Sequence, residues 1–201
     1  MTLPLMIYLL AGLTPVFFGR ISVAPFWLSV QALALGWITL SNHSPWSWHI
    51  AIGGLEILLV RAILVPHLLR RAQTRMASCA VDLMPSNLFV WSIAISLIIF
   101  AFKFTSGAEA QGLTLGVVAA TVMIAFVLLA ANHHCMVQLI ALLFMENGLA
   151  LFETLLPEPW PLPIHLIISV VYILTAALGS WLLGNEPLAD LDPAPRQGDT
   201  P

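Results

Sequence analysis

The sequence predicts an all-α integral membrane protein, a bundle of about seven transmembrane helices. Of its 201 residues, 60% are hydrophobic and only 8% are charged. A soluble domain needs roughly a quarter of its residues charged to cover its surface. The mean hydropathy of +0.96 agrees with a chain that is solvated mostly by lipid. We therefore expect a transmembrane helical domain over residues 1–184 and no large soluble domain.

Each expected helix is an apolar stretch close to the roughly 20 residues that cross a bilayer. The first stretch ends at Arg20, the second before SNHSPW, and the third at RRAQTR. The fourth ends at TSGAEAQG, the fifth at NHH, the sixth at PEPWPLP, and the seventh at the tail. The first, second and fourth are the shortest, so six helices is the alternative count. The expected spans are 2–19, 22–40, 47–68, 87–104, 111–131, 134–156 and 161–184.

The remaining segment, residues 185–201, reads NEPLADLDPAPRQGDTP. It is acidic, rich in proline and free of aromatic residues. Such a composition cannot bury enough apolar surface to offset the entropy of ordering. We expect a disordered cytoplasmic tail.

The basic residues predict the orientation of the bundle, because cytoplasmic loops are enriched in Lys and Arg. If the N-terminus lies outside, every arginine in a loop or in the tail faces the cytoplasm, and only Lys103, at a helix end, lies on the opposite side. These arginines are Arg20, Arg70, Arg71, Arg75 and Arg196. The C-terminus is then cytoplasmic. Tryptophans 46, 48 and 160 fall at the outer interface, where indole rings are favoured.

Ionisable residues inside the expected spans are the candidate functional residues. A charge in hydrocarbon costs at least ~2.5–3.5 kcal/mol on insertion scales, so such residues usually mark an ion path or a buried pair. The third span holds Glu56 with Arg61 five residues later, and the sixth holds Glu146 with Glu153 seven residues later. Seven residues make nearly two turns, so these two glutamates share a face about 10 Å apart. Gln138 lies close to the same face.

Depth estimates suggest a polar path. At ~1.5 Å per residue, Glu56 and Glu146 both lie ~14–15 Å below the outer edge, near the midplane. Arg61 is deeper, whereas Lys103 and Glu153 are nearer the outside. Burial disfavours a charged carboxylate and a nearby cation favours it, so such a group can gain and lose a proton. The alternative is that these charges only pair with one another and hold helices together.

Other chemistry finds little support. NHHC, residues 132–135, suggests a metal site by composition, but its two adjacent histidines face different directions on a helix, so an interfacial anchor is the better interpretation. The sequence contains no phosphate loop, nucleophile elbow or haem motif. We expect no catalytic residue, cofactor, metal or nucleic-acid partner.

The stretch QLIALLFMENGLALFETLLP resembles the most recognisable segment of the hydrogenase-4 membrane component E family. That family shows a Gln, an apolar run and a Glu-Asn-Gly motif inside a helix, here Gln138 followed by Glu146, Asn147 and Gly148. VRAILVPHLLRR also resembles the family's charged residue, apolar turn, proline and basic residues. The hydropathy profile is similar along nearly the whole chain except the tail. One departure is a pair of histidines at 133 and 134, where members often have Arg or Lys.

The resemblance implies a non-catalytic membrane subunit of a group 4 [NiFe] hydrogenase-type oxidoreductase complex in the bacterial cytoplasmic membrane. Such a subunit is similar to the K subunit of complex I and the C subunit of Mrp-type antiporters. Its partners would be antiporter-like and core membrane subunits, together with the lipid bilayer. Glu146 would match a midmembrane glutamate of the proton path. A subunit that joins antiporter-like modules to the core without conducting is the alternative, and a stand-alone small transporter is a third.

Overall fold

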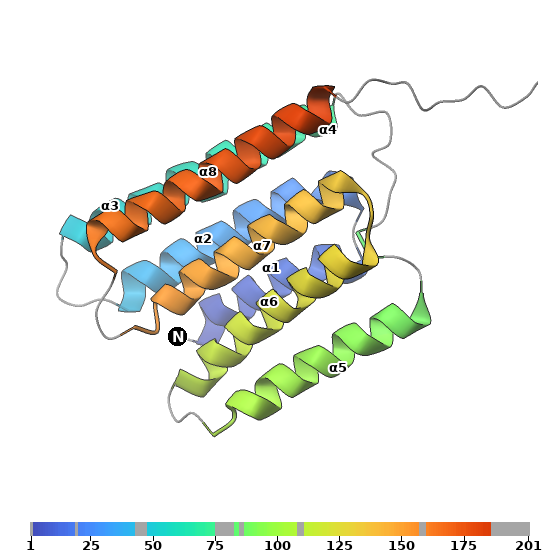
Figure 1. Cartoon of the computed structure of the whole chain (residues 1–201). Helices are drawn as coiled ribbons and strands as arrows, with labels where there is room; N and C mark the ends of the chain where they lie inside the picture. The colour runs from blue at the N-terminus through green and yellow to red at the C-terminus, as the bar shows by residue number, and fades with distance from the viewer. Residues whose placement is uncertain are drawn as a thin grey trace, which may run out of the picture.

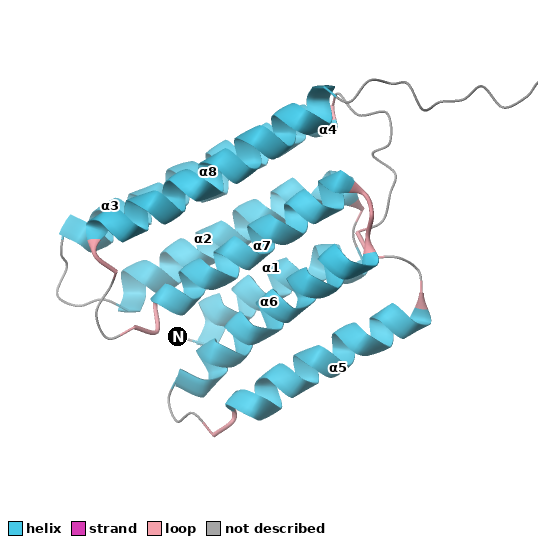
Figure 2. Ribbon diagram, viewed as in Figure 1, coloured by secondary structure: helices cyan, strands magenta, loops and turns pink. Residues whose placement is uncertain are grey.

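The fold is a bundle of helices that lie side by side, in which successive spans along the chain run in opposite directions, as Figure 1 and Figure 2 show. The computed structural model describes the chain in seven segments. Within these segments, six helical stretches are long and apolar enough to cross a membrane, and a seventh apolar helix near the N-terminus is shorter. This confirms the predicted all-α membrane architecture. The described residues are 2–18, 20–42, 48–74, 83–84, 87–107, 111–156 and 160–185.

The helices follow the predicted spans closely, because each break in apolar sequence ends a helix. The third span is one continuous rod made of α3, the π-helix η2 and α4, and it runs five residues further than the sequence suggested. The tail assigned to 185–201 lies outside the described residues, apart from its first residue. The elements are α1 (Thr2–Phe18), η1 (Ile21–Val23), α2 (Ala24–Asn42), α3 (Trp48–Glu56), η2 (Ile57–Leu64), α4 (Val65–Gln73), α5 (Leu88–Thr105), α6 (Gly112–Ala131), α7 (Cys135–Glu153) and α8 (Leu162–Asn185).

The bundle is layered, with α8 and the α3–η2–α4 rod along one edge and α5 along the opposite edge (Figure 1). Helices α1, α2, α6 and α7 fill the middle, and the main packing pairs are α1 with α2, α5 with α6, and α6 with α7. Helices α1, α3 and α8 begin, and α7 ends, at one end of the bundle, which we call the N-terminal end. The polar residues described below lie between this end and the middle.

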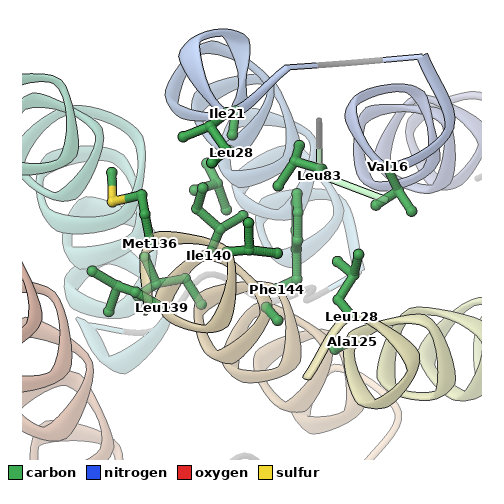
Figure 3. Packing of buried hydrophobic residues seen from close by; sticks show 14 of the residues in the cluster. Val16, Ile21, Leu28, Leu83, Ala125, Leu128, Met136, Leu139, Ile140 and Phe144 are labelled. Atoms are coloured by element: carbon green, nitrogen blue, oxygen red, sulfur yellow. The ribbon is translucent and has the colours of Figure 1, made fainter. Parts of the chain in front are cut away.

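Toward the other end, the middle of the bundle is filled by closely packed apolar side chains (Figure 3). Leu28 from α2, Leu128 from α6, and Met136 and Ile140 from α7 are fully buried there. Inside a membrane the close packing of these side chains, and not their removal from water, holds the helices together.

Glycines set the closeness of two helix pairs. A Cβ at Gly116 of α6 would lie 2.7 Å from Cδ1 of Phe102 on α5, and one at Gly148 of α7 would lie 3.3 Å from Cγ2 of Val122 on α6. Small residues at such contacts let helix backbones approach within a membrane, where packing replaces the hydrophobic effect as the driving force. Gly148 of the Glu-Asn-Gly motif therefore has a packing role against α6.

Candidate functional site: a polar network inside the bundle

The π-helix η2 brings Glu56 and Arg61 together. In a regular α-helix, residues five apart lie about 140° from one another around the axis. In a π-helix the backbone bonds run from i to i+5, so residues five apart come to the same face of the helix. Arg61 Nε is accordingly 3.5 Å from Glu56 Oε1. Pro66 gives a local reason for the wider turn, because its ring would clash with the carbonyl four residues earlier in a regular α-helix.

Arg61 is the centre of the network, with a side chain only 2% exposed. Its Nη1 donates to Asn147 Oδ1 at 3.1 Å and to the backbone carbonyl of Glu146 at 3.4 Å. Its guanidinium carbon lies 4.2 Å from the centre of the Tyr172 ring on α8. A carboxylate, an amide, a carbonyl and an aromatic face thus offset the cost of burying this cation.

Asn147 extends the network to α2. Its Nδ2 donates to Oε1 of Gln31 at 3.0 Å, and both side chains are fully buried. The amide of Gln31 also packs against α1, where a Cβ at Gly12 would lie 3.1 Å from Gln31 Nε2. The Asn147 side chain therefore joins α7 to both α2 and the η2 segment.

His165 extends the network toward the N-terminal end of the bundle. Its Nδ1 lies 3.2 Å and 3.3 Å from the two carboxylate oxygens of Glu153, at the end of α7. Its Nε2 lies 3.8 Å from Oε2 of Glu56 on α3. The imidazole, which is 20% exposed, thus bridges two carboxylates from two different helices.

Glu146 lies beside this chain of contacts and faces α8. Its Oε1 accepts a hydrogen bond of 3.3 Å from the Thr175 hydroxyl. Its Oε2 is buried and has no hydrogen-bond partner among the residues that the structure describes. A buried carboxylate oxygen without a partner is costly when charged, so this group is suited to hold a proton.

The structure brings together most of the residues that the sequence singled out. Glu56, Arg61, Glu146, Asn147 and Glu153 all belong to one network between α2, α3, η2, α7 and α8. Both glutamates of α7 contact α8, one through Thr175 and one through His165. We call these five residues together with Gln31 and His165 the polar network.

Two predicted members lie elsewhere. Lys103 is exposed at the end of α5, on the opposite edge of the bundle from α8 (Figure 1). Gln138 donates from Nε2 to the carbonyl of Asn132 at 3.0 Å, near the start of α7. The Asn132 carbonyl directly precedes α7, so Gln138 stabilises the start of this helix. Gln138 lies about two turns from Glu146.

In the NHHC stretch, His134 Nδ1 accepts from the Met136 N–H at 3.3 Å and so caps the same helix.

Sequence reasoning missed His165, Gln31 and Tyr172. Each is an isolated polar or aromatic residue in an otherwise apolar span, which is a signal that a hydropathy profile averages away. The functional reading of His165 in particular depends on Glu56 and Glu153, which are distant in sequence. Pairing across helices is therefore visible only in the folded chain.

Comparison of the chain with protein-family models, with curated proteins and with solved structures gives no match. The chemistry of the site consequently rests on its own geometry. The polar network combines three carboxylates, one imidazole and one buried guanidinium, of which Glu56 contacts Arg61 directly, inside helices that are long and apolar enough to cross a membrane. These groups can accept and release protons, and within the described residues no cluster of three or more acidic, His or Cys side chains is arranged to hold a metal ion.

Proposed function

We propose that this chain is a membrane subunit of a complex I-like, group 4 hydrogenase-type redox complex of the bacterial cytoplasmic membrane. In this role it is a non-catalytic subunit whose buried carboxylates form part of a proton path, beside antiporter-like and core membrane subunits. The observation that carries the proposal is the polar network, which runs from the N-terminal end of the bundle to Arg61 and Asn147 in its middle.

The balance of charges in the network favours proton transfer over pairing alone. Arg61 is the one permanent cation of the network, whereas Glu56, Glu146 and Glu153 supply three carboxylates. Glu56 already pairs with Arg61, and the second oxygen of Glu146 has no partner in the described part of the chain. Burying unpaired negative charge is expensive, so Glu146 is the carboxylate of this network that we expect to hold a proton and to exchange it.

The Glu-Asn-Gly motif gives the proposal its second support. Asn147 holds Arg61, Gly148 allows α6 to approach, and Glu146 is left facing α8 with a partly unsatisfied carboxylate. One short motif thus places a proton acceptor, fixes a neighbouring cation and packs a helix. This agrees with the resemblance to the hydrogenase-4 component E family, whose similarity to the K subunit of complex I implies that Glu146 matches a midmembrane glutamate of the proton path.

A scaffold without conduction is the alternative, and one observation favours it. Helices α5 and α8 expose many large apolar side chains, among them Phe100, Phe104, Ile167 and Trp181. In a membrane these side chains face lipid or a neighbouring subunit. A scaffold would use such faces, and it would need the polar network only to lock its own helices together.

The test is Glu146→Gln in the intact complex, read by subunit content and by proton uptake into vesicles. Arg61 contacts the backbone carbonyl of Glu146, and its carboxylate partner is Glu56, so the substitution leaves the contacts of Arg61 in place. We therefore expect normal assembly. Because an amide cannot take up and release a proton, uptake should fall at least about tenfold, as for loss of a positioned acid–base group.

The matched variant is Glu153→Gln, which removes the same charge closer to the helix end. Water can replace a carboxylate there more readily, so its effect on uptake should be milder. Normal assembly together with normal uptake in Glu146→Gln would rule out the proton path and leave the scaffold.

A further inference from the structure

We propose that His165 transfers protons between Glu153 and Glu56, and that protons enter the polar network through it from the N-terminal end of the bundle. This inference rests on the proposed proton path and names its entrance. The observation that supports it is the placement of the His165 imidazole between two carboxylates that come from two other helices.

The geometry sets one ring nitrogen toward each carboxylate. Nδ1 is within hydrogen-bond distance of both oxygens of Glu153, at 3.2 Å and 3.3 Å. Nε2 is 3.8 Å from Glu56 Oε2, which is longer than a direct proton transfer allows but short enough to close by a small ring movement. Gly53 leaves space for this movement, because a Cβ there would lie 3.4 Å from Nε2.

The charges around His165 come from each helix packed against it. Glu153 faces it from α7 and Glu56 from α3, while Arg61 of η2 lies beyond Glu56. His165 also lies in the first turn of α8, where the helix dipole disfavours a cation. Two carboxylates therefore stabilise an imidazolium on this ring, whereas Arg61 and the helix end oppose it.

The proton moves from Glu153 to Glu56 in two steps. Glu153, which is 15% exposed, takes a proton from water and gives it to Nδ1, so that the ring becomes an imidazolium. The imidazolium then releases the proton on Nε2 to Glu56, and the ring is neutral again with its proton on Nδ1. A flip of the ring, or return of the proton by the same path, restores the starting tautomer. No bond other than those to the proton forms or breaks.

His165→Gln tests this in the intact complex, with His67→Gln as the matched control on an exposed site of α4. An amide can keep a hydrogen bond to Glu153 but cannot carry the proton. We expect His165→Gln to assemble, to lose at least about tenfold in proton uptake, and to lose the part of the pH dependence of uptake that comes from the imidazole, measured from about pH 5 to 9. His67→Gln should match the wild type in all three.

Comparison with Glu146→Gln separates the two hypotheses. Impaired uptake in Glu146→Gln together with uptake within twofold of wild type in His165→Gln overturns the role of His165 and leaves the proposed function intact. Normal uptake in both variants overturns both.

A second measurement applies even if His165→Gln fails to assemble. Nitrogen-15 spectra of the complex with labelled histidine should contain an imidazolium signal that titrates and changes in Glu153→Gln, a variant that keeps the histidine. If no histidine signal responds to Glu153→Gln at any pH from 5 to 9, His165 does not exchange protons with Glu153 and the inference is wrong.

Discussion

Arg61 is the residue whose loss should damage the bundle most. It is buried, and its partners come from three separate elements: Glu56, Asn147 and Tyr172. Breaking a buried ion pair by removing one member costs about 3–5 kcal/mol, because the other charge remains unpaired. We expect Arg61→Met to destabilise the protein by about this amount, measured as unfolding in a detergent titration.

The double variant Arg61→Met with Glu56→Gln separates pairing from packing. It removes the uncompensated carboxylate as well, so much of the lost stability should return. If the double variant is as unstable as the two single losses added together, the Glu56–Arg61 pair contributes no coupling energy and the network must be held by other contacts.

Among the elements, the π-helix η2 should tolerate the loss of one residue. A π-turn is equivalent to one extra residue in an α-helix, so removing one residue from η2 should restore regular winding. Leu59 is half exposed and lies between Glu56 and Arg61. Its deletion would place these two residues four apart, on one face of an α-helix. We expect the pair, the fold and assembly to survive, measured as subunit content and thermal stability.

Deletion of Leu174, which is similarly exposed on the regular helix α8, is the control. There the deletion turns every later residue by about 100° and moves Thr175 away from Glu146. This variant should lose assembly. Equal loss in both deletions would show that the π-turn does not absorb the change.

The contact between α5 and α6 depends on Gly116. A methyl group there would meet Phe102 at 2.7 Å and the Thr105 hydroxyl at 2.9 Å. Overpacking of this kind costs about 1–3 kcal/mol. Gly116→Ala should therefore lower the melting temperature and loosen α5, measured by cysteine cross-linking between the two helices. Gly107→Ala is the control, because nothing lies within 4 Å of the added Cβ, and it should change neither the melting temperature nor the cross-linking. If Gly116→Ala also leaves both unchanged, Phe102 moves aside freely.

For the whole molecule, the distribution of arginines predicts an outside N-terminus and a cytoplasmic C-terminus. Ser106 is exposed at the N-terminal end of the bundle. A cysteine placed at Ser106 should therefore react with a reagent that cannot cross the membrane, added from outside. A phosphatase fused to the C-terminus should remain in the cytoplasm and show no periplasmic activity. Labelling of that cysteine only from the cytoplasmic side would reverse the orientation, and with it the side from which protons reach Glu153.

The sequence alone determined that this protein is a helical membrane bundle, the approximate limits of its helices, and that Glu146 and Glu153 share a helix face. These follow from apolar length and helical period, which are properties of neighbouring residues. Only the tertiary structure decided that Arg61 meets Asn147, that Gln31 and His165 join the network, and that Lys103 stays apart. Such contacts depend on how each helix is rotated against its neighbours, and the π-turn before Pro66 changes that rotation for α3 relative to α4. A hydropathy profile sums residues along one helix, so it cannot report which of them face one another.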